Sequence, residues 1–275
     1  MPLLTKRTTI RPHAKFHPTL EISSTVRRGQ HGEIVRFIQE WLVLHHVHID
    51  IDSDYGPATE QAVRDFQGSS GVLPVTGVVD AETYAMLARP MVEALRPITP
   101  PAGATLGQMI AACALQHLGQ HAREVGGQNR GPWVRLYLRG DERPPDKSLP
   151  KGFDAWCAGF ATTIIAHAAK AMGAKSTPLG YHTNCNKLAA AAEKEKRFVR
   201  GEKAKHHEIP TGSLMLIRNP GRRDRWHHTG VVMQALPDHV LLIEGNSANR
   251  TSESPSGEVC RRRRPYSKLD FVIIE

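Results

Sequence analysis

A proline-rich segment divides this 275-residue chain into two parts with different apolar patterns. Residues 90–104 carry Pro90, Pro97, Pro100 and Pro101, and proline at that density is not expected to remain helical. Apolar residues recur at helical spacing before this segment, whereas short apolar runs of strand length dominate the end of the chain. We therefore expect two domains joined by a linker over residues 90–104.

The first part predicts a small three-helix domain over residues 26–89, preceded by a polar lead-in segment, residues 1–25. One helix is expected from Ile34, a second from Pro57, which favours a first helical position, and a third after Asp80 as its N-cap. The apolar residues expected to be buried are Ile34, Phe37, Ile38, Trp41 and Leu42 in the first helix, Ala58, Ala62, Val63 and Phe66 in the second, and Tyr84 and Leu87 in the third.

The second part, residues 105–275, is expected to place helices before strands. Thr105 can cap one helix, and Asp154 can cap another over residues 155–172, with Gly173 as its terminator. The apolar runs of strand length that follow are Leu214–Ile217, Thr229–Gln234, His239–Glu244 and Phe271–Ile274. Helices followed by strands predict an α+β fold with an antiparallel sheet.

Composition excludes some classes of protein, and charge favours certain classes of binding partner. Hydrophobic residues make up 40% and charged residues 23%, which suits a chain that buries a core and excludes a wholly disordered or collagen-like protein. Residues 1–100 hold 10 basic and 11 acidic side chains, whereas residues 101–275 hold 26 and 16, so the formal net charge of +9 lies in the second part. Such a field favours polyanions: nucleic acid, acidic lipid headgroups or an anionic cell-wall polymer.

The sequence predicts a chain without a membrane span or signal peptide. No apolar run approaches the roughly 20 residues that a span requires. Lys6, Arg7 and Arg11 interrupt the start of the chain, so we expect synthesis in the cytoplasm without a signal peptide. Neither a CxxC pair nor a disulfide framework is expected from the four cysteines, Cys113, Cys157, Cys185 and Cys260.

Cys157 is the candidate nucleophile. If Asp154 caps the helix, Cys157 lies in its first turn, where free backbone N–H groups and the positive end of the helix dipole favour a thiolate. A nucleophilic thiol also needs a nearby base. The alternative, a buried structural cysteine, stays open at this point.

A predicted hairpin supplies the base. One strand starts near His228, and the chain turns at residues 236–238 and returns through Glu244 and Asn246. In antiparallel register His228 lies roughly opposite Asn246, and Glu244 shares a face with Asn246 because the strand period is two. His227 is expected to point to the opposite face. An imidazole with two candidate orienting groups suits a Cys–His pair, although an exposed polar hairpin end is the alternative.

These residues resemble the cysteine/histidine-dependent amidohydrolase/peptidase (CHAP) family, papain-like relatives of the NlpC group. The resemblance covers residues 105–275 and rests on residues 156–160 around Cys157, on 228–232 around His228, and on 244–246, with a Gly/Asn-rich stretch at 124–131. It implies a papain-like α+β domain with Cys157, His228, Glu244 and Asn246 as catalytic residues. No cofactor or metal site is predicted from the residues, but some members of the family bind calcium, so a calcium site stays open at this point. Ser213 departs from the family, where an acidic residue usually ends the preceding turn.

Residues 26–88 resemble the three-helix peptidoglycan-binding module. The matching segments are Val26–Gly29, Val35–Gln39, Asp54–Thr59, Ala62–Gln67 and Thr76–Asp80. Most of the matching positions are core and turn residues, so the resemblance implies the fold more firmly than the sugar or peptide that is bound.

Together the two resemblances imply a peptidoglycan hydrolase that cleaves an amide of the wall peptide, as an N-acetylmuramoyl-L-alanine amidase or an endopeptidase. The alternatives are a non-catalytic wall-binding protein and, less favoured, a basic nucleic-acid binder. A hydrolase of this kind would act in the periplasm or wall, either as a phage endolysin released through holin-made holes or as an injected antibacterial effector. An effector would have a cognate immunity protein as a partner.

Other polar clusters are expected to be structural or solvated. The clusters His45–His48 and His206–Glu208 lack zinc-hydrolase spacing, so no metal site is predicted there. The acidic run that starts at Asp50 lacks the glycine and glutamate of an EF-hand. Arg261–Arg264 is interpreted as a solvated basic surface that suits an anionic wall.

Overall fold

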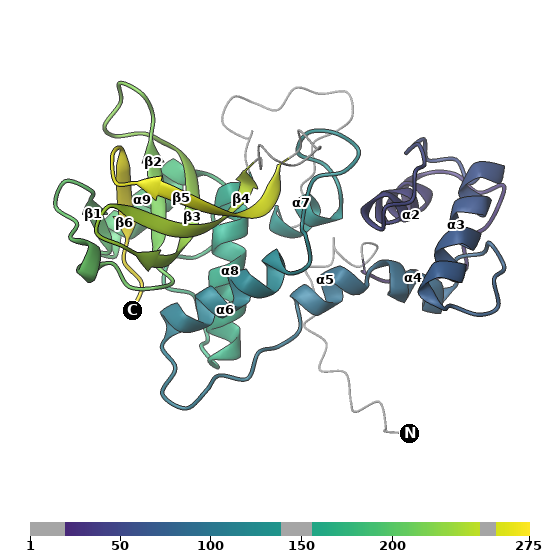
Figure 1. The fold of residues 1–275 in the computed structure, drawn as a ribbon, viewed down its shortest axis with the longest axis horizontal. Coiled ribbons are helices and arrows are strands. Elements are labelled where there is room, and N and C mark those ends of the chain that lie inside the picture. Colours follow the sequence, from purple (N-terminus) through teal and green to yellow (C-terminus); the bar gives the residue numbers. More distant parts are fainter. Residues whose placement is uncertain (1–19, 139–155, 248–256) are drawn as a thin grey trace. The chain divides into compact units, whose positions relative to one another are not determined.

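The computed structural model describes residues 20–138, 156–247 and 257–275 (Figure 1). The chain divides into two compact units, residues 1–95 and 96–275, and each is described by itself. Most of the predicted lead-in segment, residues 1–19, lies outside the described residues.

The N-terminal unit contains the predicted helices, with Asp80 as a cap. Its helices are α2 (Glu33–Leu44), α3 (Pro57–Ser70), α4 (Ala81–Leu87) and α5 (Arg89–Ala94). The side chain of Asp80 accepts a hydrogen bond of 2.8 Å from the backbone N–H of Thr83, which confirms the predicted N-cap. Phe37, Ile38, Trp41, Leu42, Val63, Phe66, Tyr84 and Leu87 are buried as predicted.

Two details of this unit differ from the prediction. Helix α5 occupies the start of the segment that was predicted to be a linker, because Pro90 lies in its first turn, where no intrahelical N–H is needed. Met91 and Ala94 of α5 are buried, so residues up to Leu95 belong to this unit. In α3, Ala58 is exposed and Thr59 is buried in its place.

The C-terminal unit is an α+β fold with a six-stranded antiparallel sheet, as predicted. The strand order is β1-β6-β2-β3-β4-β5. Its strands are β1 (Phe198–Arg200), β2 (Leu214–Arg218), β3 (Trp226–Ala235), β4 (His239–Ser247), β5 (Glu258–Pro265) and β6 (Leu269–Val272). Its helices are α6 (Leu106–Leu118), α7 (Pro132–Tyr137), α8 (Cys157–Ala171), α9 (Cys185–Lys194) and the 3₁₀ turn η2 (His206–Glu208).

Some elements of this unit have no counterpart in the sequence prediction, namely α7, α9, β1 and β5. The cap of α6 is the predicted one: Thr105 accepts a hydrogen bond from the N–H of Gln108, whose side chain accepts one from Thr105. Helix α8 begins at Cys157, after Trp156. The N-cap is Trp156, which makes no side-chain cap hydrogen bond, so the prediction of Asp154 as the N-cap was wrong because the helix starts further along the chain. Asp154 itself lies outside the described residues.

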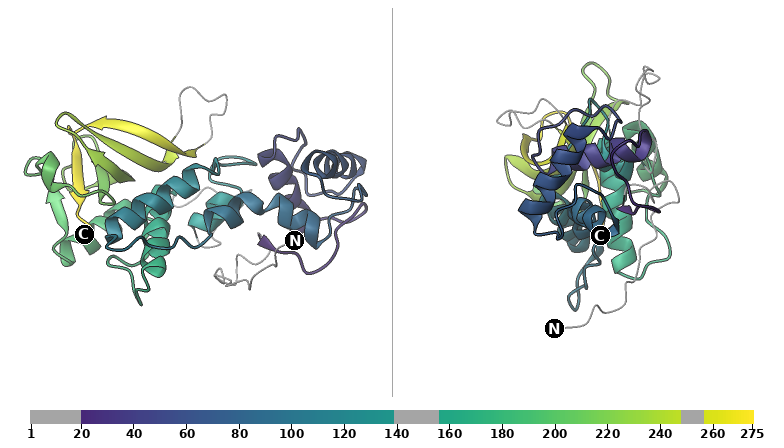
Figure 2. Two further views of the ribbon diagram at one scale, coloured as in Figure 1. Left: turned by 60° about the horizontal axis from the view of Figure 1, so that its bottom comes forward. Right: turned by 90° about the vertical axis from the view of Figure 1, so that its right-hand side faces the viewer.

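Helices and strands of this unit form layers. Helix α8 packs against β3 and β4, and α6 packs against α8. In the left view of Figure 2 these teal helices lie along one side of the green and yellow strands. Met215, Val232, Leu242 and Phe271 belong to a buried apolar cluster on the sheet. The layers bring the first turn of α8 to the neighbouring strands β3 and β4.

Candidate active site

Cys157 is the first residue of α8 and is fully buried. The ring of the preceding residue, Trp156, stacks on Tyr137 with the centroids 5.1 Å apart and an interplanar angle of 11°. Its indole N–H donates to Glu124 Oε1 at 2.8 Å, and Glu124 also accepts from the backbone N–H of Gly257 at 3.1 Å. These contacts hold the start of α8, and therefore Cys157, in a defined position.

His228 lies on β3 and bonds to a carboxylate on β4. Its Nε2 is 2.7 Å from Glu244 Oε2, and Glu244 is fully buried. His227, its neighbour on the strand, is exposed, so the two imidazoles lie on opposite faces as predicted. The hairpin has the predicted register, with Val231 opposite Ile243.

Gly230 and Gly245 lie so close to residues of this site that neither position has space for a side chain. A Cβ on Gly230 would lie 2.6 Å from Glu244 Cγ, so a side chain there would displace the carboxylate that bonds to His228. A Cβ on Gly245 would lie 2.7 Å from atoms of Trp156 and Phe160, so β4 approaches α8 closely only with glycine. The two positions that follow His228 and Glu244 in the sequence therefore require glycine on steric grounds.

Cys157 and His228 interact, and each shifts the pKa of the other. Since Nε2 of His228 bonds to Glu244, Nδ1 is the ring nitrogen that remains for a further partner. The pKa of Cys157 is lowered well below its ordinary value by hydrogen bonds from Cys185 and then from His228, against the opposing effect of burial. Burial alone would lower the pKa of His228, but Cys157 and Glu244 raise it to about 9. The directions of both shifts favour a thiolate–imidazolium pair.

Glu244 is kept ionised by an arginine that the sequence analysis did not assign to the site. Arg264 on β5 makes a bidentate interaction with the carboxylate, with Nε 2.5 Å from Oε1 and Nη2 2.7 Å from Oε2. Burial alone would raise the pKa of Glu244, but Arg264 and His228 lower it to about 2. The imidazole of His228 therefore faces a carboxylate rather than a neutral acid.

The interpretation of Arg261–Arg264 as a solvated surface was wrong for half of the run. The four arginines form part of β5, so alternate side chains lie on opposite faces. Arg261 and Arg263 are exposed, whereas Arg264 bonds to Glu244 and Arg262 donates to Ser247 Oγ at 3.0 Å.

Asn246 lies close to the other candidates along the chain, but a bulge separates it from Glu244. The β4–β5 register shifts between Glu244 and Ser247, and Asn246 has φ 54°. The regular alternation behind the predicted shared face is therefore broken there. Its Oδ1 lies close against Gly257, and the imidazole of His228 donates its Nε2–H to Glu244.

Cys185 is the second thiol at this site, and the sequence analysis did not select it. It is the first residue of α9, and its sulfur lies 3.8 Å from that of Cys157. All four cysteines are free and buried. The two cysteines are 28 positions apart in the sequence and follow no motif, so only the fold brings them together.

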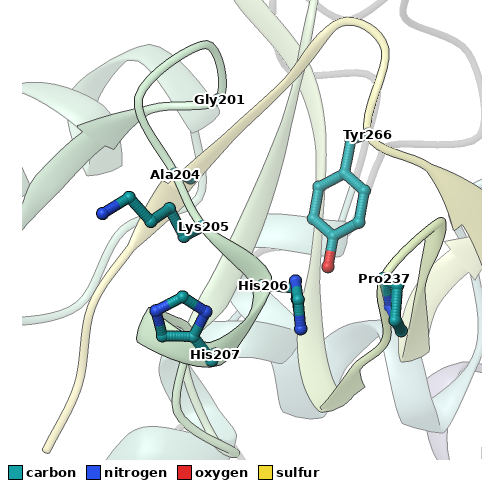
Figure 3. Close-up of a pocket in the computed structure, with 7 residues that line it drawn as sticks. All are labelled: Gly201, Ala204, Lys205, His206, His207, Pro237 and Tyr266. Carbon is teal, nitrogen blue, oxygen red and sulfur yellow. The ribbon is translucent and has the colours of Figure 1, made fainter.

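The C-terminal unit also has a pocket whose lining includes none of the cysteines. The pocket, of about 370 Å³, is lined by His206, His207, Lys205, Tyr266 and Pro237, together with Gly201 and Ala204 (Figure 3). Lys205 and His207 both lie near Glu208, at 3.4 and 3.9 Å, which reduces the positive charge at its rim. No group of three or more His, Cys, Asp or Glu side chains in the described part of the chain is arranged to hold a metal ion.

The N-terminal unit uses its polar clusters to fix loops. His45 Nε2 bonds to the carbonyl oxygen of Leu87 at 2.8 Å, and Asp52 accepts from Gln39 at 2.7 Å. Gln67 accepts from the backbone N–H groups of Thr76 and Gly77, both at 2.9 Å. The histidine and aspartate runs of this unit thus have structural partners.

Comparison with known proteins identifies one region of the chain. Residues 31–87 match the family model described as "Putative peptidoglycan binding domain". This peptidoglycan-binding domain supports association with the cell wall. No model of the CHAP family or of another catalytic family matches the chain, and neither a curated protein nor a solved structure matches it.

Among the helices within residues 20–138, 156–247 and 257–275, none is long and apolar enough to span a bilayer.

Proposed function

We propose that this protein is a cysteine-dependent hydrolase that cleaves an amide bond of the peptidoglycan peptide. The observation that supports the proposal best is the linked series Cys157, His228, Glu244 and Arg264, in a chain that also contains a peptidoglycan-binding domain. A domain that holds the chain on an insoluble polymer raises the local concentration of the catalytic unit at its substrate.

In the proposed reaction the Cys157 thiolate attacks the carbonyl carbon of the amide. The first helical hydrogen bond of α8 runs from Phe160 N–H to Trp156 O, so the N–H groups of residues 157–159 precede the ladder. These N–H groups, at the positive end of the helix, are the proposed donors to the tetrahedral oxyanion.

The imidazolium of His228 then donates its proton to the leaving amine. Water attacks the thioester, His228 accepts a proton from that water, and the Cys157 thiolate leaves to complete the cycle. Glu244 holds the ring orientation and stabilises its positive charge, and Arg264 holds Glu244.

The decisive experiment compares the full-length wild type with Cys157→Ala on purified sacculi. The wild type is expected to release soluble fragments with one new amine and one new carboxyl end, and Cys157→Ala is expected to sediment with the sacculi and release none. Mass spectrometry of the fragments identifies the bond and so separates an amidase from an endopeptidase. Equal release by the variant would exclude Cys157 as the nucleophile.

The second candidate, a wall-binding protein without catalysis, is favoured by the family match, which covers only the binding domain. It predicts that the wild type sediments with sacculi and releases no fragments.

The place of action is also a proposal. We propose that the protein acts in the periplasm or wall after delivery through holin-made holes or by injection. An injected hydrolase would need an immunity protein that covers Cys157. A holin gene beside this one would favour the phage route, and a small secreted partner would favour the effector.

A further inference from the structure

The two sulfurs at this site meet at the ends of two helices. Cys157 begins α8, which has 15 residues, and Cys185 begins α9, which has 10. Their sulfur atoms are 3.8 Å apart, within hydrogen-bonding distance for a thiol and a second sulfur. Both residues are buried, so water competes little for this contact.

The neighbours of the two sulfurs decide which one carries the negative charge. His228 and the backbone N–H of Thr229 both lower the pKa of Cys157. The pKa of Cys185 is raised well above its ordinary value, first by its hydrogen bond with Cys157 and then by burial. The directions of the two shifts favour Cys185 as the donor of the pair.

We infer that Cys185 is a further catalytic residue, whose thiol donates a hydrogen bond to the Cys157 sulfur and holds it as the nucleophilic thiolate. This inference rests on the proposed function in one respect, the role of Cys157 as nucleophile. It assigns to the C-terminal unit a residue for which neither the sequence pattern nor the family match provides a role.

The charge on Cys157 changes during the proposed reaction, and Cys185 responds without losing its proton. Attack forms the sulfur–carbon bond and moves the negative charge from sulfur to the carbonyl oxygen, which weakens the Cys185 hydrogen bond. When water cleaves the thioester, the sulfur–carbon bond breaks and its electron pair returns to Cys157. The Cys185 thiol then stabilises the leaving thiolate, while His228 carries out the proton transfers.

Other ionisable groups also act on Cys157, so the experiment must separate them from Cys185. His228 on β3 lowers the pKa of Cys157, His227 on the same strand interacts with it electrostatically, and Glu244 and Arg264 act through His228. A substitution at Cys185 leaves all four of these side chains in place.

The test is a titration of the thiolate ultraviolet absorbance in the full-length protein, from about pH 4 to about pH 10. The spectrum of Cys157→Ala is subtracted to remove tyrosine and the other cysteines. Cys185→Ala is expected to move the midpoint upward by about one pH unit, a loss of about tenfold in thiolate below the midpoint. Cys185→Ser, whose hydroxyl can still donate, is expected to keep the midpoint close to that of the wild type.

The matched control is Cys113→Ala, because Cys113 is a buried thiol in α6 whose pKa burial raises to about 12. It removes a buried sulfur from the same unit and is expected to leave the midpoint unchanged. Circular dichroism verifies that each variant is folded.

Two results would overturn the inference: an unchanged midpoint in folded Cys185→Ala, or a low-pH thiolate that persists in Cys157→Ala. The titration needs no substrate, so it is separate from the sacculus experiment. If sacculi stay intact but the midpoint shifts as expected, the proposed hydrolysis fails and the role of Cys185 in forming the thiolate stands.

Discussion

Both units bury polar side chains, but the groups they bury differ in chemistry. In the N-terminal unit the buried polar groups include the neutral amides of Gln39 and Gln67, each bonded to a loop that follows its helix. This unit also buries the carboxylate of Glu40, which pairs with Arg36 at 3.3 Å. In the C-terminal unit the buried groups include a thiol, an imidazole and a carboxylate, at Cys157, His228 and Glu244. Neutral amides fix a surface in place, whereas adjacent ionisable groups can exchange protons.

The difference also appears in how each buried group is compensated. Gln39 has no charge to compensate: it donates to Asp52 at 2.7 Å and accepts from the N–H of Ser53 at 2.8 Å. Glu244 carries a charge that burial opposes, and Arg264 and His228 offset it. The first unit therefore resembles a rigid binding scaffold, and the second contains charges that depend on one another.

Removal of the Glu244 charge is the strongest way to break this arrangement. Glu244→Gln keeps the shape but leaves the His228 imidazolium without its anion, and we expect hydrolysis to fall by about 10³- to 10⁴-fold. The measurement is the release of fragments from sacculi and the binding of the protein to them, which should not change. Asn246→Gly, which keeps the positive φ, is the comparison and should lose far less activity. Equal losses in the two variants would show that the carboxylate has no special role.

Arg264→Gln tests the next link outward. We expect hydrolysis to fall by about 10- to 100-fold, since loss of a group that orients a catalytic side chain has effects of that size. Arg263→Gln is the matched control, because Arg263 precedes Arg264 on β5 but is exposed. A similar loss in both variants would indicate a general effect of surface charge.

Arg264→Gln and Arg263→Gln are also expected to differ in their unfolding at acidic pH. The pKa of Glu244 is lowered from 4.5 to about 2, so its contribution to stability is present above pH 4.5 and is lost as the pH falls toward 2. Without Arg264 the pKa of Glu244 rises, so acid unfolding of Arg264→Gln should begin at a higher pH than that of Arg263→Gln. Tryptophan fluorescence against pH measures this, and identical curves would contradict the role of Arg264.

A rise in pH should affect only the C-terminal unit. The pKa of His228 is raised to about 9, so its proton is present below that pH and is lost as the pH rises through it. Hydrolysis needs this proton for the leaving amine and should fall by up to about tenfold per pH unit above pH 9. Sedimentation of Cys157→Ala with sacculi over the same range tests the binding domain and should stay constant. A rate that stays level to high pH would remove His228 as the general acid.

The sequence predicted best those features that depend on short-range pattern. The β3–β4 hairpin follows from two apolar runs around a turn at Leu236, so His228 could be placed on a strand near Glu244. Asp80 and Thr105 carry the N-cap pattern, which acts within four residues.

Features that depend on tertiary contacts could not be predicted in the same way. The Arg264–Glu244 contact was missed because β5 has charged side chains where an apolar alternation marks a strand, and its order beside β4 is set by the sheet. Cys185 was missed because its partner is 28 residues away. Asn184 before it, which caps α9, was a readable signal for the helix, but not for the contact between the sulfurs.

Gln67→Leu is expected to have the smallest effect on the reactive groups around Cys157. It therefore gives the sharpest contrast between the two units. This change leaves the backbone N–H groups of Thr76 and Gly77 without their buried acceptor, which should destabilise the loop by about 2–3 kcal/mol. Gln61→Leu on the same helix is the control, because Gln61 is exposed and bonds only to Asp65 within the described structure.

Hydrogen exchange of the full chain, read by peptide mass spectrometry, should show faster exchange over residues 72–80 in Gln67→Leu and unchanged exchange in α8 and β3. Binding to sacculi should weaken, while the thiolate titration of Cys157 should match that of the wild type. The reason is that the amide of Gln67 affects only the loop it holds, whereas every buried charge at Cys157 depends on its neighbours. A shift of the Cys157 titration in Gln67→Leu would mean that the two units are energetically coupled, and the contrast between scaffold and reactive site would then fail.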